Sequence, residues 1–170
     1  RRAVVSYYSQ WESCMQWNTL IRGVQQDYRR NTRKLLSAEQ FRWARANLSD
    51  AHMVGAKGQY ARFVSAKLKG ANLSKATLEE ADFGEASLHQ TDFTEADLRR
   101  SEMSEVRAAQ ANFTKARMDG VVGSGGKFPE ANFTGAALVG ARLDGARLKN
   151  ARLGRAVAQG MRAPGAVLSN

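Results

Sequence analysis

The chain has 170 residues and a formal net charge of +10 at pH 7, which favours acidic partners but does not specify a fold. The single cysteine, Cys14, excludes an internal disulfide and a cysteine-based zinc site. No run of about 18 apolar residues is present, so we expect a soluble protein without a transmembrane helix.

The first forty residues have helical spacing. Apolar residues recur at steps of three and four at Cys14, Trp17, Ile21, Val24 and Tyr28. Ser9 and Glu12 have the spacing of a capping box, which marks a helix start. We therefore predict an N-terminal α-helical annex over residues 1–40.

Two roles are open for this annex. It could cap the N-terminal end of the domain that follows, because an open end exposes apolar surface and unpaired edges. Alternatively, Trp11, Trp17 and Tyr28 could dock another protein, since aromatic side chains often anchor interfaces. The chain begins with Arg1-Arg2 rather than Met, so we expect a processed form or a fragment.

A period of five governs residues 41–170. Alanine opens about 19 of about 26 successive pentapeptides, and Leu, Phe, Met or Trp holds the third place in about 21. Ala71-Asn72-Leu73-Ser74-Lys75 and Ala131-Asn132-Phe133-Thr134-Gly135 are typical units. A helix needs a period of 3.6 and a strand a period of 2, so neither can continue through this region.

The Ala-x-Leu-x-x pattern, with Asp or Asn common in second place, resembles the pentapeptide-repeat family. The resemblance implies an all-β solenoid, a right-handed quadrilateral parallel β-helix with four pentapeptides per coil. Residues 41–170 would then form about six coils. The first and third residues of each unit would point inward, and Leu73, Phe93, Phe113 and Phe133 would stack on one wall.

Charges on the outside are segregated. With twenty residues per coil, Arg107, Lys127 and Arg147 form a ladder of like charge that would attract an anion. Asn72, Asp92, Asn112 and Asn132 form a polar ladder able to hydrogen-bond to itself. Arg142, Arg147 and Arg152 are either a solvated face or a basic patch for an acidic protein or for anionic lipid headgroups.

Nucleic acid is disfavoured as a partner. The basic stretches lack interleaved exposed aromatic residues, and the acidic belt over residues 79–105 would interrupt a phosphate track. The candidate partner-binding residues are therefore Trp11, Trp17, Tyr28, Arg107, Lys127, Arg142, Arg147 and Arg152.

The sequence offers no catalytic, cofactor-binding or metal-binding constellation. His52 and His89 would lie in different coils, without other ligands at suitable spacing. The glycine-rich segment 120–126 precedes Lys127, but Phe128 stands where a phosphate-binding loop requires Ser or Thr. We interpret this segment as an irregular side or outward loop and expect a conformational soft spot there.

The C-terminal end has no matching helix. The central residues shrink to Ala158 and Ala163, which indicates that the column tapers. Its edge would stay bare, pair with a second copy to form a homodimer, or contact a partner.

We therefore expect a non-enzymatic scaffold or accessory subunit of a larger assembly. By analogy with the family, a plastid or thylakoid photosynthetic complex and a bacterial cell are the leading locations. One alternative is a topoisomerase-binding DNA mimic, which the charge of +10 disfavours. A secreted bacterial effector scaffold is the other alternative.

Overall fold

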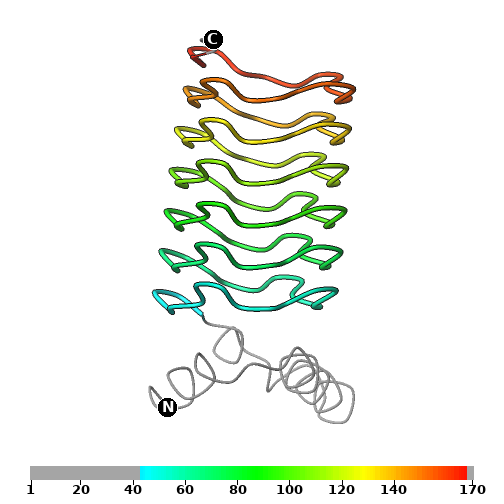
Figure 1. Ribbon diagram of the computed structural model, residues 1–170. Helices are drawn as coiled ribbons and strands as arrows, with labels where there is room; N and C mark the ends of the chain where they lie inside the picture. Colours follow the sequence, from blue (N-terminus) through cyan, green and yellow to red (C-terminus); the bar gives the residue numbers. More distant parts are fainter. Residues whose placement is uncertain (1–42, 168–170) are drawn as a thin grey trace.

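A computed structural model describes residues 43–167 of the chain. Stacked coils form a column through this range, with the N-terminal coil at one end and residue 167 near the other (Figure 1). The predicted annex over residues 1–40, including Trp11, Trp17 and Tyr28, lies outside the described residues and stays a prediction.

Every pentapeptide ends in a tight turn. The amide of the first residue of one unit donates to the carbonyl of the third residue of the preceding unit, as between Ala96 and Phe93 at 3.0 Å. The fifth residue of each unit is in the left-handed region, with φ between 55° and 69°. The chain therefore changes direction once every five residues, which explains the period in the sequence.

Backbone pairing links residues twenty apart. Asn112, for example, forms parallel bridges with Asp92 and Asn132, and its amide donates to the Thr91 carbonyl at 2.9 Å. The described residues contain single bridges of this kind rather than continuous strands or helices. Twenty residues and four turns per coil give a four-walled β-helix, and residues 43–167 make just over six coils.

We number the walls by one pentapeptide of each. Wall 1 contains residues 61–65, wall 2 residues 66–70, wall 3 residues 71–75 and wall 4 residues 76–80. Each wall also contains the described pentapeptides that lie multiples of twenty residues away. Successive pentapeptides of one wall form the rungs of a ladder, about 4.8 Å apart.

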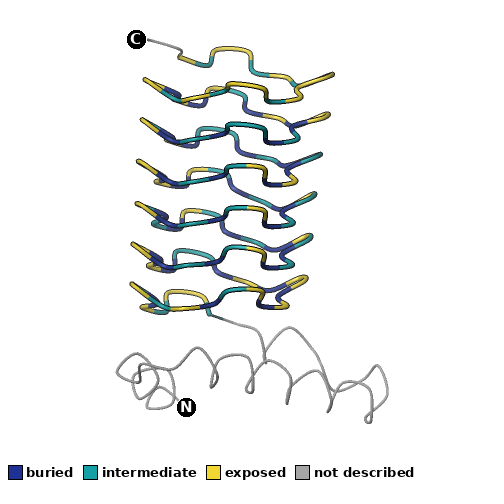
Figure 2. Cartoon of the chain, turned by 45° about the vertical axis from the view of Figure 1, so that its right-hand side comes forward, coloured by how far each residue is buried: buried dark blue, intermediate teal, exposed yellow. Residues whose placement is uncertain are grey.

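The core is a column of the first and third residues, and dark buried segments line the inside of the coils in Figure 2. Leu73, Phe93, Phe113 and Phe133 are at most 1% exposed, which confirms their inward positions on successive rungs. The rings of Phe93 and Phe113 stack with centroids 5.2 Å apart, and those of Phe113 and Phe133 stack at 4.9 Å. Stacked aromatic and aliphatic rungs therefore stabilise each coil through its neighbours.

The interpretation of residues 120–126 as an irregular or outward loop is wrong. Their bridges and turns keep the regular register, and Val121, Gly123 and Gly126 are all buried. A side chain at Gly126 would collide with Phe128, whose ring fills the space that the small residues leave. The glycines are thus part of the packed column, because a large neighbour replaces their missing volume.

The last described coil is less well covered. Its central residues Leu153, Ala158 and Ala163 are half-buried or exposed, whereas Leu138 and Leu143 one rung below are buried. A homodimer through this end stays a prediction. Within residues 43–167, no helix has the length and apolar character needed to cross a membrane.

Candidate functional site

The second residue of each repeat points outward, and it has a different role on wall 2, wall 3 and wall 4. On wall 3 this residue closes the turn: Asp92, Asn112 and Asn132 accept from amides two residues later at 2.9–3.1 Å. The side-chain amide of Asn112 also donates to the Thr94 hydroxyl at 2.9 Å, and that of Asn132 donates to the Thr114 hydroxyl at 3.0 Å. The predicted polar ladder is confirmed over these rungs, where its side chains form hydrogen bonds within the protein.

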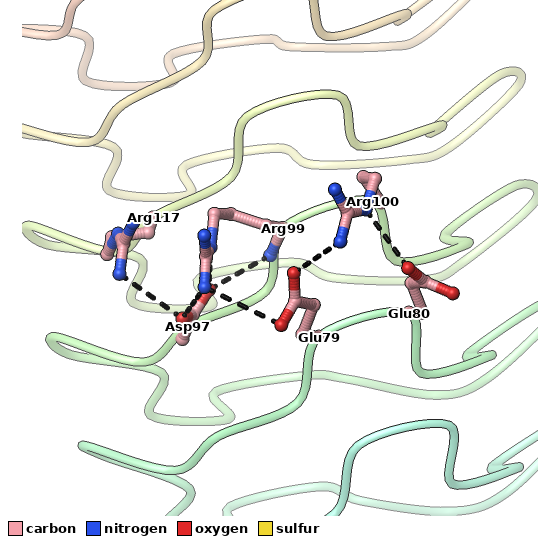
Figure 3. Close-up of polar contacts among 6 residues, drawn as sticks. All are labelled: Glu79, Glu80, Asp97, Arg99, Arg100 and Arg117. Carbon is pink, nitrogen blue, oxygen red and sulfur yellow. Dashed lines mark hydrogen bonds and ion pairs between the residues drawn. The ribbon is translucent and has the colours of Figure 1, made fainter.

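Wall 4 carries a network of ion pairs. Figure 3 shows Asp97 between Arg99, at 2.7 Å, and Arg117 on the next rung, at 3.3 Å. Arg99 and Arg100 both reach Glu79 on the rung below, at 3.6 and 2.5 Å. Opposite charges on neighbouring rungs therefore neutralise each other on this wall.

The network acts on the ionisation of Asp97, whose side chain is 16% exposed. The hydrogen bond from the Arg99 guanidinium is the largest influence and lowers the pKa of Asp97 below its usual value. Burial opposes this effect, while the charges of Arg99 and Arg117 add to it. The same partnership raises the pKa of Arg99.

Wall 2 differs from wall 4, because basic residues on neighbouring rungs are paired with one another rather than with acidic residues. Parallel bridges join Arg107 to Lys127 and Lys127 to Arg147, so the predicted ladder of like charge is confirmed in register. All three side chains are exposed, and none has a carboxylate within 4.0 Å among residues 43–167. Neighbouring rungs are about 4.8 Å apart, so the like charges on them repel one another. We call Arg107, Lys127 and Arg147 the cation ladder.

The other proposed arginines lie on different walls. Arg142 is on wall 1, where its guanidinium lies 3.6 Å from the Asp144 carboxylate. Arg152 is on wall 3, bridged to Asn132. The proposed residues therefore do not form one patch, and only the cation ladder brings three of them together.

A groove that the sequence did not predict lies beside the cation ladder. Its volume is about 640 Å³, and it follows the edge between walls 1 and 2. The lining residues are Ser49, Ser65, Lys67, Lys69, Glu85, Ser87, Glu105, Arg107 and Lys127. One side of the groove is formed by residues 65, 85 and 105, and the other side by residues 67, 87, 107 and 127. Within each side the residues are twenty apart, so the twenty-residue register is the sequence signal that could have predicted the groove.

On the acidic side of the groove, the carboxylates of Glu85 and Glu105 point in different directions along the column. Ser65 donates its hydroxyl to the Glu85 carboxylate at 3.2 Å, whereas the Glu105 carboxylate lies over Gly125, where a larger residue would collide with it. Glu85 thus reaches toward the rung before it and Glu105 toward the rung after it. Among residues 43–167, no basic side chain has a nitrogen within 4.0 Å of either carboxylate.

The two histidines lie on different walls. The ring nitrogen Nδ1 of His89 lies 3.0 Å from the Ser87 hydroxyl, and His52 is on wall 3. No group of three or more His, Cys, Asp or Glu residues suited to a metal ion occurs within residues 43–167.

Comparisons with known families agree with the repeat. A family model described as "Pentapeptide repeat region" matches residues 36–113. A second, "Pentapeptide repeats (8 copies)", matches residues 101–138, 124–155 and 131–170. No relative was found among curated protein sequences.

Several solved structures are similar to the chain. HetL, a pentapeptide repeat protein involved in heterocyst differentiation regulation in the cyanobacterium Nostoc sp. strain PCC 7120, is 26% identical, with a TM-score of 0.30. The match covers 73% of this chain and 64% of HetL. QnrB1, a plasmid-mediated fluoroquinolone resistance protein, is 18% identical over 75% of this chain and 79% of its own, with a TM-score of 0.37.

A pentapeptide repeat protein from the Arabidopsis thaliana thylakoid lumen is 23% identical, with a TM-score of 0.18. That match covers 68% of this chain and 59% of the plant protein. The chain thus spans less than two thirds of HetL and of the plant protein.

Proposed function

The chain belongs to the pentapeptide-repeat family, and from this premise we propose that it is a non-enzymatic scaffold that binds acidic surfaces of other proteins. In this proposal the column is a right-handed quadrilateral β-helix, and its outer walls are the binding surfaces. The partner is an acidic protein or an acidic region of a multi-subunit complex.

The cation ladder carries the proposal. The same twenty-residue register that pairs Asp97 with Arg117 on wall 4 stacks Arg107, Lys127 and Arg147 on wall 2. Repulsion along the ladder disfavours the isolated protein slightly, and an anionic partner would relieve it. A partner with matched carboxylates would gain both affinity and a faster association rate.

A non-enzymatic role is supported by how the described carboxylates are used. Asp82, Asp92 and Glu102 accept from backbone amides at their own turns, at 2.7–3.1 Å. Glu79, Glu80 and Asp97 form ion pairs with arginines. These acids have structural partners, so they are poorly suited to act as general acids or bases.

Pull-down with charge variants tests the proposal. The triple variant Arg107→Glu, Lys127→Glu and Arg147→Glu removes the cation ladder. A control triple, Lys57→Glu, Lys75→Glu and Lys115→Glu, makes the same charge change at exposed sites on walls 3 and 4. Native partners identified by mass spectrometry should be retained by the control and lost by the ladder variant. Retention of the same partners by both variants would contradict the proposal.

The narrower forms of the proposal rest on family analogy. One is an accessory subunit of a plastid or thylakoid complex, and another is a secreted bacterial effector scaffold. The full-length N-terminus in the native source tests both, because a plastid targeting peptide or a bacterial secretion signal would assign the compartment.

A topoisomerase-binding DNA mimic is disfavoured. Such a mimic presents acidic surfaces, whereas Glu79, Glu80 and Asp97 of the acidic belt are neutralised by arginines. We therefore expect no inhibition in a gyrase supercoiling assay, and clear inhibition would favour the mimic over the scaffold.

A further inference from the structure

We propose that the groove between walls 1 and 2 binds an extended peptide of alternating charge, lying along the column axis. This inference rests on the proposed scaffold function and specifies one binding mode for the partner. It uses Lys67, Glu85 and Glu105, which the cation ladder does not include.

The first argument is that the groove has two sides of opposite charge. The wall 1 side has the acidic residues Glu85 and Glu105, and the wall 2 side has the basic residues Lys67, Lys69, Arg107 and Lys127. No described ion pair closes across the groove within 4.0 Å. Both rows of charge are therefore available to a ligand that enters between them.

The second argument concerns the shape of such a ligand. Successive side chains of an extended strand point to opposite sides, so alternating acidic and basic residues give the strand one acidic and one basic edge. The acidic edge would face Lys67, Arg107 and Lys127, and the basic edge would face Glu85 and Glu105. A ligand of uniform charge would satisfy only one side.

The third argument is the match of spacings. Three rungs separate Lys67 from Lys127, which is about 14.4 Å along the column, and two acidic residues four positions apart in a strand are about 13.6 Å apart. The two basic residues between them on the other edge would be about 6.8 Å apart. Glu85 and Glu105 are one rung apart but their carboxylates diverge, toward Ser65 and over Gly125, so they can meet this spacing.

The same charges disfavour other classes of ligand. A nucleic-acid backbone or a sheet of anionic headgroups would place phosphates against Glu85 and Glu105 as well as against the cations. Repulsion from the carboxylates would offset much of the attraction. A polypeptide can change the sign of its charge from one residue to the next, so it is the partner that the groove fits.

Three fluorescent octapeptides test the inference by anisotropy titration on the full chain at low salt. One alternates Glu and Lys, one has four Glu followed by four Lys, and one has eight Glu. The first two have identical composition, so only the arrangement of charge differs. We expect the alternating peptide to bind at least about fivefold more tightly than the block peptide, as one or two exposed ion pairs would give.

Variants then locate the site. Lys67→Ala should weaken the alternating peptide about threefold, and Glu85→Gln with Glu105→Gln should weaken it while strengthening the all-Glu peptide. Lys75→Ala, on wall 3, removes the same charge and should change neither affinity. Circular dichroism and thermal unfolding of each variant show that the fold is kept.

The inference is overturned if the block and alternating peptides bind equally, if the all-Glu peptide binds best to the unmodified chain, or if the alternating peptide fails to bind. It is also overturned if duplex DNA or phosphatidylserine vesicles displace the alternating peptide and bind in a manner that depends on Lys67. These results would leave the scaffold proposal standing as long as the ladder variant still loses its partners. Partner retention by that variant is the separate failure of the scaffold proposal.

Discussion

At the residue scale, the fifth position of each repeat sets the turn. It has positive φ throughout residues 43–167, and most of these positions hold residues other than glycine, such as Lys115 and Glu130. A side chain in this region costs about 1–2 kcal/mol relative to its usual conformation. The hydrogen bonds of the turn and the packing of the coil must offset this cost at every corner.

Two glycines allow the cost of the left-handed backbone conformation to be measured without a change in side-chain packing. Gly140 has φ of +66° and Gly154 lies outside the left-handed region, and a methyl group added to either meets no atom within 4 Å. We expect Gly140→Ala to lower the free energy of unfolding by about 1 kcal/mol. Gly154→Ala should raise it by about 0.4–1 kcal/mol, because it restricts only the unfolded chain.

Urea denaturation of both variants measures the difference. Equal effects of the two substitutions would show that the conformation at the turn does not determine their cost.

The two buried hydroxyl groups at first positions provide a second prediction. Thr91 donates to the Leu68 carbonyl at 2.8 Å, whereas the Ser101 hydroxyl has no hydrogen-bond partner in the described structure. Thr91→Ala should therefore lower the free energy of unfolding by about 1 kcal/mol. Ser101→Ala should raise it by up to about 1 kcal/mol, since it removes an unsatisfied buried polar group.

Thermal unfolding compares these variants directly. A loss of stability in Ser101→Ala as large as that in Thr91→Ala would contradict the assignment of Ser101 as unsatisfied.

At the element scale, some pentapeptides combine a small residue at one inward position with a larger one at the other. Val106 accompanies the small centre Ala108, and Val121 accompanies Gly123. In the next unit the order reverses, with Gly126 before Phe128. All of these residues are buried, so the column stays packed although single inward positions hold small residues.

The pair formed by Gly126 and Phe128 can be tested by a double-mutant cycle. A methyl group at Gly126 would lie 2.5 Å from Phe128 Cε2, so Gly126→Ala should lower the free energy of unfolding by about 1–3 kcal/mol. Phe128→Leu should lower it separately by leaving a cavity. Together they create the common Ala-x-Leu unit, so the double loss should be smaller than the sum by about 0.5–3 kcal/mol.

A cycle that combines Gly126→Ala with Phe83→Leu is the control, because Phe83 lies two rungs away on wall 1. Its losses should add to within about 0.5 kcal/mol. Additive losses in both cycles would show that volume is not shared within the unit.

The ion-pair network on wall 4 predicts a dependence on pH. The pKa of Asp97 is lower in the folded protein than the ordinary pKa of an aspartate side chain, because Arg99 donates a hydrogen bond to its carboxylate. Its contribution to stability is therefore present above the unfolded pKa and is lost as the pH falls through the folded pKa. Asp97→Asn should reduce the difference in unfolding free energy between pH 7 and pH 3.

Arg99→Gln provides the matched variant, because the hydrogen bond from Arg99 is the largest cause of the lowered pKa. Its Asp97 carboxyl should titrate at a higher pH in an NMR experiment. An unchanged titration would mean that Arg99 does not set this pKa.

At the scale of the whole molecule, the pentapeptide pattern predicts which residues point inward, and its resemblance to the pentapeptide-repeat family implies the twenty-residue register, but neither predicts the surface. Phe93, Phe113 and Phe133 lie on one wall because each occupies the apolar third position of a repeat and they are spaced twenty residues apart, which is one coil. The sequence alone does not predict that the glycine-rich segment is packed, because the ring of Phe128 fills the space beside Gly126 only in the folded column. The groove was missed because Glu105 and Lys127 come together only once neighbouring walls are folded.

The length of one coil, twenty residues, determines which charged residues become neighbours on the surface of the column. Wall 4 places opposite charges on neighbouring rungs, and wall 2 places Arg107, Lys127 and Arg147 on neighbouring rungs with like charge. The proposed binding surfaces exist only if this register holds along the column.

Distances between paired spin labels test this register most directly. Cysteines introduced at Asn47 and Lys127, or at Asn47 and Arg147, with Cys14→Ser in both, lie four and five rungs apart on wall 2. Electron double resonance should give mean distances near 19 and 24 Å, which differ by the rise of one coil, about 4.8 Å. Equal distances, or a shorter distance for the second pair, would contradict a column with twenty residues in each coil.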